Sequence, residues 1–156
     1  MLEVEDLFKG AWVWFKTNNK PAQITENYML LDGSRKRMVS LDAAHERYCV
    51  PIEEVEPIEI SIGLLIKNGF LEFDKQKFIS KDSDIYIIYE EDGFSIEVQL
   101  IKHHYNTIDN KEQYEEFWRL EIDGPGGHFE TTREKIFVHE LQYALKLCKI
   151  KKNIIV

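Results

Sequence analysis

The clearest pattern in the chain is an alternation of hydrophobic and polar residues between positions 85 and 100. A hydrophobic run, Ile85–Tyr89, leads into the acidic segment Glu90–Gly93, and apolar residues then occupy every second position from Phe94 to Leu100. A period of two is typical of a strand with one buried face, and a short Asp-Gly segment between two such runs is typical of a tight turn. We therefore predict a β-hairpin here.

The same alternation returns after position 117. Trp118–Asp123 alternates apolar with charged residues, Gly124–Gly127 has the composition of a turn, and His128–Thr131 resumes an extended pattern. Together with the hairpin, these segments predict an antiparallel β-meander that has one buried face and one face in water.

Two helices are predicted from their boundary residues. Ser61 can cap a short helix over Ile62–Lys67, and Asn68–Gly69 can end it in a left-handed conformation. Near the C-terminus, Thr131 and Glu134 have the spacing of a capping box. The helix expected after them places five apolar residues on one side, which should cover the meander: Phe137, Leu141, Ala144, Leu145 and Cys148.

The first third of the chain shows short apolar stretches separated by turn residues, which predict four or five strands and a small, strongly bent SH3-like barrel. The predicted strands lie at Ala11–Phe15, Ala22–Thr25, Tyr28–Leu31, Met38–Leu41 and Tyr48–Val50. An acidic connector between Pro51 and Pro57 follows, where prolines cannot donate to a sheet. We predict an α+β protein with an SH3-like module at 1–56 and a meander domain with its two helices at 57–156.

Charge and length narrow the function classes. The chain has 156 residues, 44% of them apolar, and its 20 basic and 28 acidic residues give a net charge of -8. That charge disfavours broad contact with nucleic-acid backbones or anionic membranes. Neither a membrane-spanning stretch nor a standard signal segment is recognised, and Cys49 and Cys148 are expected to be reduced thiols. We expect a cytoplasmic protein.

Two passages resemble a known group of proteins. These are Pro57–Ser61 running through Lys67–Phe70, and the closing segment Val138–Leu145. They resemble a widespread group of small uncharacterised proteins of gut bacteria and their bacteriophages, in which a short strand module precedes the same passage, a meander and a terminal helix. The resemblance implies a mobile-element setting in a bacterial host cell or virion, with virion-associated, regulatory and defence-related accessory roles all open.

No arrangement in the sequence predicts catalysis. His139 and Glu140 begin a helical segment similar to a zinc protease motif, but Tyr143 stands where the second histidine would be, and a neutral phenol is a poor zinc ligand. His139 is expected to face solvent, opposite the apolar stripe. A metal-assisted hydrolase at His139 and Glu140 is the third hypothesis, and we expect no enzyme activity and no cofactor.

Three further histidines are weak candidates for metal binding. His103 and His104 are adjacent on an extended segment, so their side chains point to opposite faces and cannot chelate one ion together. His128 or a carboxylate of the meander could complete a site with one of them, but no spacing demands it. The sequence therefore predicts no metal site.

A basic turn carries the strongest case for nucleic acid. Arg35, Lys36 and Arg37 follow one another, and Trp12 and Trp14 of the same module could stack bases beside a basic groove. One face of the first strand must nevertheless be core. The leading hypothesis is a non-enzymatic protein that binds a protein partner, homo-oligomerisation being one version, through aromatic and acidic residues on an exposed sheet face or edge. The alternative is a nucleic-acid-binding regulator that uses the basic turn.

Overall fold

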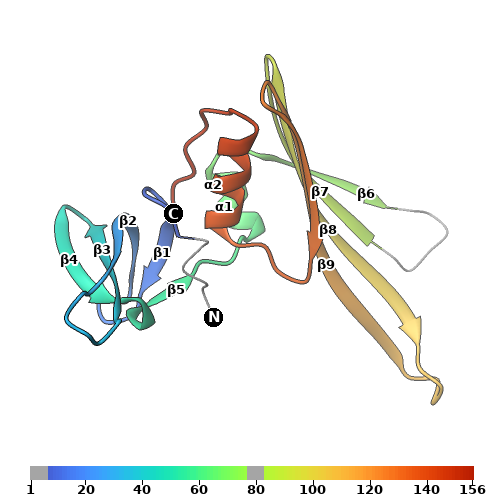
Figure 1. Cartoon of the computed structure of the whole chain (residues 1–156). Coiled ribbons are helices and arrows are strands. Elements are labelled where there is room, and N and C mark those ends of the chain that lie inside the picture. The colour runs from blue at the N-terminus through green and yellow to red at the C-terminus, as the bar shows by residue number, and fades with distance from the viewer. Residues whose placement is uncertain (1–6, 77–82) are drawn as a thin grey trace. The chain divides into compact units, whose positions relative to one another are not determined.

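The structure is a computed structural model that describes residues 7–76 and 83–156 (Figure 1). Its strands are antiparallel and form two five-stranded sheets, and helices complete an α+β fold, as predicted. The chain divides into two compact units. The first contains the chain up to Glu59 together with residues 137–142 and 156, and the second contains residues 60–136 and 143–155.

The first unit is built on one sheet, whose strand order is β4-β3-β2-β1-β5. Its strands are β1 (Trp12–Phe15), β2 (Lys20–Met29), β3 (Arg37–Ala43), β4 (Glu46–Pro51) and β5 (Val55–Pro57), with a short 3-10 helix, η2 (Ile52–Glu54), before β5. Val13 and Phe15 are buried, whereas Trp12 and Trp14, on the other face of β1, are half-buried. The alternation in β1 therefore places its two tryptophans outside the core.

Two predictions for the first unit differ from the structure, and one is that the separate strands expected at Ala22–Thr25 and Tyr28–Leu31 are replaced by the single strand β2. Val55–Pro57, which we expected to be a connector, is the edge strand β5 and pairs with β1, Val13 lying opposite Pro57. A proline is tolerated there because an edge strand has one side without ladder hydrogen bonds. The described strands form an open sheet, and no closed barrel is found among them.

The second unit contains the predicted meander, with strand order β10-β9-β8-β7-β6. Its strands are β6 (Leu71–Gln76), β7 (Ser83–Glu91), β8 (Phe94–Asn106), β9 (Glu112–Gly124) and β10 (Gly127–Arg133). The predicted hairpin is confirmed, since Glu91 pairs with Phe94 across the turn. Apolar residues of one face are buried, namely Ile87, Ile96, Val98, Leu100, Leu120 and Ile122.

The short helix α1 (Ile62–Lys67) has the predicted bounds and caps. The Ser61 side chain accepts a hydrogen bond from the Leu64 N–H at 3.2 Å, and Gly69 has a φ of +83°. Asn68 caps the C-terminus of the helix, and its side-chain amide donates a hydrogen bond to the Leu64 carbonyl at 2.9 Å. The local sequence is therefore sufficient to specify this helix.

The second helix, α2 (Val138–Leu147), begins later than predicted, and the proposed capping box of Thr131 and Glu134 is wrong. Thr131 pairs with Leu120 in the ladder between β10 and β9, so its backbone is extended. The cap lies further along: the Glu140 carboxylate accepts a hydrogen bond from the Phe137 N–H at 2.9 Å. Long-range strand pairing has overridden a local capping signal.

Two further expectations can be compared with the structure. Cys148 is buried, as predicted from its place in the apolar stripe, whereas Cys49 is exposed on β4, and both are free thiols. Among the described residues, no helix is long and apolar enough to cross a membrane.

Candidate functional site

A two-stranded extension of the second sheet is its most exposed feature. β8 and β9 pair from Ser95 and Asp123 to Asn106 and Glu112, but β10 pairs with β9 only as far as Trp118. We call residues 103–117 the arm; they lie in the long hairpin of β8 and β9 in Figure 1. Residues 113–117 form the outer edge of the arm, and no strand in the described part of the chain pairs with that edge.

The turn at the end of the arm is fixed by its own sequence. The Thr107 N–H donates to the Lys111 carbonyl at 3.0 Å, and the Lys111 N–H donates to the Thr107 hydroxyl at 3.2 Å. Asn110 takes a φ of +56°, a left-handed conformation that asparagine tolerates. Ile108 in this turn is fully exposed, so the end of the arm presents an apolar side chain to solvent.

Cross-strand pairs order the side chains of the arm. The rings of His104 and Tyr114, which lie opposite each other, have centroids 6.0 Å apart, and the Tyr105 hydroxyl donates to the Gln113 side chain at 3.1 Å. Tyr114 is nevertheless 61% exposed. The edge strand thus combines an exposed aromatic ring with ordered polar neighbours.

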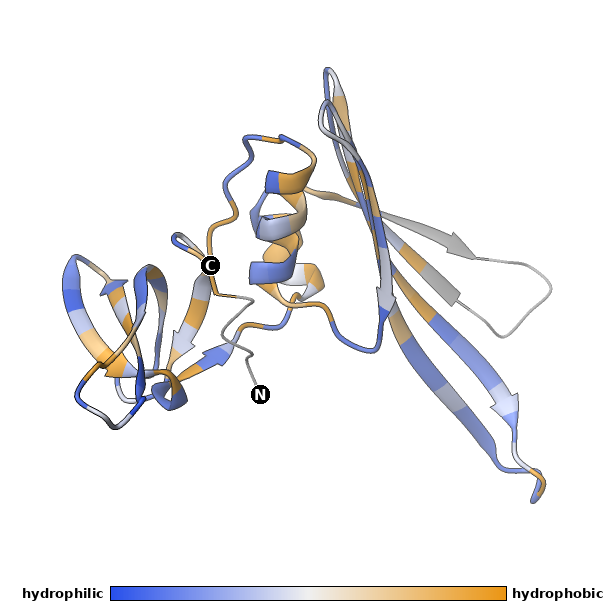
Figure 2. Cartoon of the chain, viewed as in Figure 1, coloured by the Kyte–Doolittle hydropathy of each residue, from blue (hydrophilic) through white to orange (hydrophobic). Residues whose placement is uncertain are grey.

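The edge strand is also acidic. Glu112, Glu115 and Glu116 are exposed, and a lysine on β8, Lys102, forms an ion pair with Glu116 at 2.8 Å. Figure 2 shows that hydrophilic residues predominate along the arm. A long, exposed strand edge with this composition can take up an additional strand that carries the opposite charge.

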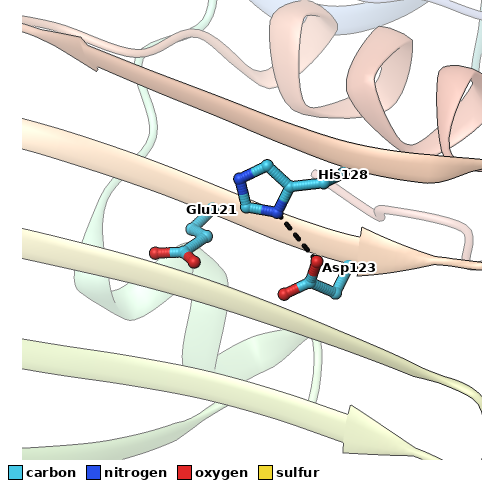
Figure 3. Close-up of side chains that lie close together, drawn as sticks. All are labelled: Glu121, Asp123 and His128. Carbon is cyan, nitrogen blue, oxygen red and sulfur yellow. Dashed lines mark hydrogen bonds and ion pairs between the residues drawn. The ribbon is translucent and has the colours of Figure 1, made fainter.

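A second group of polar side chains lies on the solvent-facing side of β9 and β10. Asp123 and His128 lie directly opposite each other, and their Oδ1 and Nδ1 atoms are 2.8 Å apart (Figure 3). Glu121 lies two residues before Asp123 and therefore on the same face. One ligand atom from each of these residues lies within 4.8 Å of the others. In the part of the chain that the structure describes, no other group of three possible metal ligands meets this criterion.

Arg119 forms ion pairs with two carboxylates on the same face. Its guanidinium contacts Glu121 at 2.8 Å and Glu130 at 2.9 Å, and these carboxylates raise its pKa. The pKa of His128 is also raised, mainly by its hydrogen bond to Asp123 and further by the charges of Asp123, Glu121 and Glu130. The carboxylates therefore give this face a negative electrostatic potential, which favours the binding of cations.

The expectation that His139 faces solvent is wrong. Its side chain is only 4% exposed, and its ring stacks on Phe137 with centroids 5.8 Å apart and an interplanar angle of 11°. The first turn of α2 is buried on more than one side, because Val138 and Leu141 are buried together with His139. Glu140 caps that turn. Packing and capping thus account for both residues of the broken protease motif.

The other predicted histidines are separated along the second sheet. His103 and His104 lie in the arm, where His103 contacts Phe117 with ring centroids 6.3 Å apart. His128 lies on β10, opposite Asp123 near the other end of β9. Glu121 and Asp123 are the meander carboxylates that form a group of possible metal ligands with His128, and the sequence did not single them out. Their spacing of two on a strand, followed by a tight turn and a histidine, is a signal that could have identified them.

The basic turn and the tryptophans lie at different places along β2. Arg35, Lys36 and Arg37 are exposed, and Arg37 pairs with Met29 at the end of β2. Trp14 pairs with Pro21, which precedes Met29 by eight residues in β2. Eight residues correspond to about 26 Å along a strand. Trp12 is likewise distant, since it lies opposite Gln23. The register does not bring the basic and aromatic residues to one end of the sheet.

The first unit also contains a hollow of about 440 Å³. Its lining combines the cationic side chains of Lys9 and Arg47 with the acidic Glu26 and the polar Thr25, Ser40, Tyr48 and Cys49. The Cys49 thiol is hydrogen bonded with the Tyr28 hydroxyl, which raises the tyrosine pKa. The mixed charge of this lining does not define a ligand class.

No protein-family model matches the chain, and neither a curated protein nor a solved structure matches it. The residues of the chain itself are therefore the basis for proposing a function.

Proposed function

We propose that this protein is a non-enzymatic interaction protein and that it binds a protein partner through the arm. The outer edge of β9, residues 113–117, would accept an extended segment of the partner as an additional strand. The observation that supports this most directly is the edge itself, which extends past the last residue of β9 that β10 covers. Backbone groups along such an edge can form a new ladder with an incoming strand.

Charge indicates the chemistry of the partner segment. Glu115 and Glu116 are adjacent on the edge strand, so their side chains lie on opposite faces, and Glu112 precedes them. An incoming strand that carries lysine or arginine would meet a carboxylate on either face. Two copies of this chain joined at the same edge would bring glutamates together, so a basic partner is favoured over a homo-oligomer.

Aromatic residues of the arm would supply the apolar contribution to partner binding. Tyr114 is 61% exposed, and Phe117 at the base of the arm is half-buried. Tyrosine buries a large area at low entropic cost, and aromatic residues are enriched at protein interfaces. Cross-strand contact with Tyr114 would therefore add to the backbone hydrogen bonds.

Binding can be tested with short synthetic peptides and the full chain. A peptide of alternating lysine and threonine should bind, and its addition should shift the backbone amide resonances of residues 113–117. The corresponding glutamate–threonine peptide should not bind. Charge reversal at Glu115→Lys/Glu116→Lys should weaken binding about tenfold or more, because like charges would then face each other.

The matched control is Glu90→Lys/Asp92→Lys, which makes the same change of charge at two exposed residues, one at the end of β7 and one in the turn that follows it. This variant should bind the basic peptide nearly as well as the natural sequence does. Equal weakening in both double variants would show non-specific attraction to an acidic protein and would contradict the proposal. Resonance shifts confined to another part of the chain would contradict it as well.

We also propose a setting and a finer fold assignment. The sequence resemblance supports an accessory role in a phage or other mobile element, acting in the bacterial cytoplasm or in a virion, and leaves virion-associated, regulatory and defence-related roles open. An SH3-like barrel for the first unit is supported by the strand order β5-β1-β2-β3-β4 and by a 3-10 helix between β4 and β5.

The alternative proposal is a nucleic-acid-binding regulator that uses Arg35, Lys36 and Arg37. The supporting observation is that all three side chains are exposed, two before β3 and one at its first residue. Binding to single-stranded DNA should then weaken steeply with salt and disappear on charge reversal at the three positions. Absent or salt-independent binding would eliminate this alternative.

A further inference from the structure

The exposed face of β9 and β10 brings together nitrogen and oxygen donors from two strands. Antiparallel pairing sets Asp123 opposite His128, and the pleat of β9 turns Glu121 to the same face (Figure 3). The backbone ladder that determines these positions runs through seven residue pairs of β9 and β10. A regular sheet is a rigid support, so the three Cβ atoms are placed before any ligand binds.

The distances among the donors suit one metal ion. The Nδ1 atom of His128 and Oδ1 of Asp123 are 2.8 Å apart, and one ligand atom from each of the three residues lies within 4.8 Å of the others. Two ligands that are each about 2.1 Å from the same zinc ion are separated by roughly 3 to 4 Å. Small side-chain rotations would therefore suffice to place all three donors around one ion.

The donor set and the local charge select the class of ion. Imidazole nitrogen with carboxylate oxygen suits Zn²⁺ and similar transition metals, whereas Mg²⁺ and Ca²⁺ prefer oxygen alone. Glu130 adds a carboxylate 3.8 Å from Nε2 of His128, and Glu97 pairs with Glu121 from β8. The group thus contains two carboxylates and has two more beside it. Arg119 offsets part of their charge.

We propose that Glu121, Asp123 and His128 form a binding site for a divalent transition-metal ion of the Zn²⁺ type. The metal replaces the hydrogen bond between Nδ1 of His128 and Oδ1 of Asp123. Three protein donors leave a coordination position for water or for a ligand from a bound molecule. Because Asp123 and His128 are both exposed, that position is accessible from solvent. The site involves none of the edge residues of the arm, so it is independent of the proposed partner binding.

The test uses the full chain without an affinity tag, stripped of metal and titrated with Zn²⁺ by calorimetry and with Co²⁺ by visible absorption. We expect one equivalent of each to bind, with Co²⁺ bands that report nitrogen and oxygen ligation. His128→Gln and Asp123→Asn should each weaken Zn²⁺ binding about tenfold or more. Mg²⁺ should not compete at comparable concentrations. Binding should also weaken as the pH falls, because protons compete for His128 beside Glu121, Asp123, Glu130, Glu97 and Arg119.

The matched control is His103→Gln/His104→Gln, which removes two exposed histidines of the arm and should leave Zn²⁺ binding unchanged. His128→Gln and Asp123→Asn replace exposed side chains, and circular dichroism should show that both variants remain folded. Zn²⁺ binding that persists in His128→Gln, or that is lost in the arm variant, would overturn the proposal. The absence of any one-equivalent Zn²⁺ binding by the natural sequence would overturn it too.

Discussion

The side chain of Gln142 completes the hydrogen bonding of the backbone at Trp12, 130 residues away in sequence. Its Oε1 atom accepts a hydrogen bond from the Trp12 N–H at 2.9 Å, and its Nε2 atom donates to the Gly10 carbonyl at 3.0 Å. One amide thereby satisfies a donor and an acceptor at the start of β1. A distant residue of α2 is thus a structural part of the first unit.

Gln142→Ala should lower the free energy of unfolding of the first unit by about 1–2 kcal/mol, because two part-buried backbone groups lose their partner. Gln142→Glu should also destabilise, since a carboxylate cannot donate to the Gly10 carbonyl. Urea denaturation measures both effects. Gln113→Ala, which removes an exposed glutamine from the arm, should change stability by less than about 0.5 kcal/mol; an equal loss there would contradict the role of Gln142.

Gly124→Ala should destabilise the second unit by about 2–3 kcal/mol. A Cβ atom at this position would lie 2.6 Å from the Cys148 carbonyl oxygen and 2.9 Å from the Ile150 side chain, so backbone would have to move. Gly63→Ala is the control, because a Cβ there meets nothing within 4 Å and alanine favours helix α1. Thermal unfolding should show a lower Tm for the first variant and an unchanged or higher Tm for the second.

Lys152 should stabilise the second unit through an aromatic ring. Its Nζ atom lies 3.5 Å from the centroid of Tyr89 and 5.6 Å from that of Phe70, and burial lowers its pKa. Lys152→Ala should cost about 1 kcal/mol in chemical denaturation, from the lost cation–π contact and stem packing. The neighbouring exposed lysine provides the comparison: Lys151→Ala should have little effect, and a similar cost in both would refute the assignment.

The pKa of His128 predicts a pH-dependent contribution to stability. Because its hydrogen bond to Asp123 raises the pKa in the folded state above the ordinary value of 6.5, folding favours the protonated imidazole. The stabilisation is fully present below pH 6.5 and is lost as the pH rises through the folded-state pKa. A titration of the imidazole resonance should show a pKa above 6.5. Asp123→Asn should return it toward that value, and an unchanged pKa in this variant would contradict the stated cause.

Several features were determined by the sequence alone, because they depend on neighbours along the chain. Ser61 and Gly69 bound helix α1 through their own side-chain and backbone preferences, and both predicted ends are confirmed. The alternation from Phe94 to Leu100 identified a strand and its buried face, because side-chain direction in a strand depends only on position. Leu100, at the end of that run, is buried as expected.

Other features were decided by tertiary pairing. Thr131 has a capping signal, yet it lies in a strand because β9 offers its backbone a ladder of hydrogen bonds. Val55–Pro57 is a strand because it pairs with β1, and His139 is buried because tertiary packing covers more than one side of the first turn of α2. The Glu121, Asp123 and His128 group depends on the register between β9 and β10. A sequence lists donors and periodicities, but register between segments is set by the packing of the whole sheet.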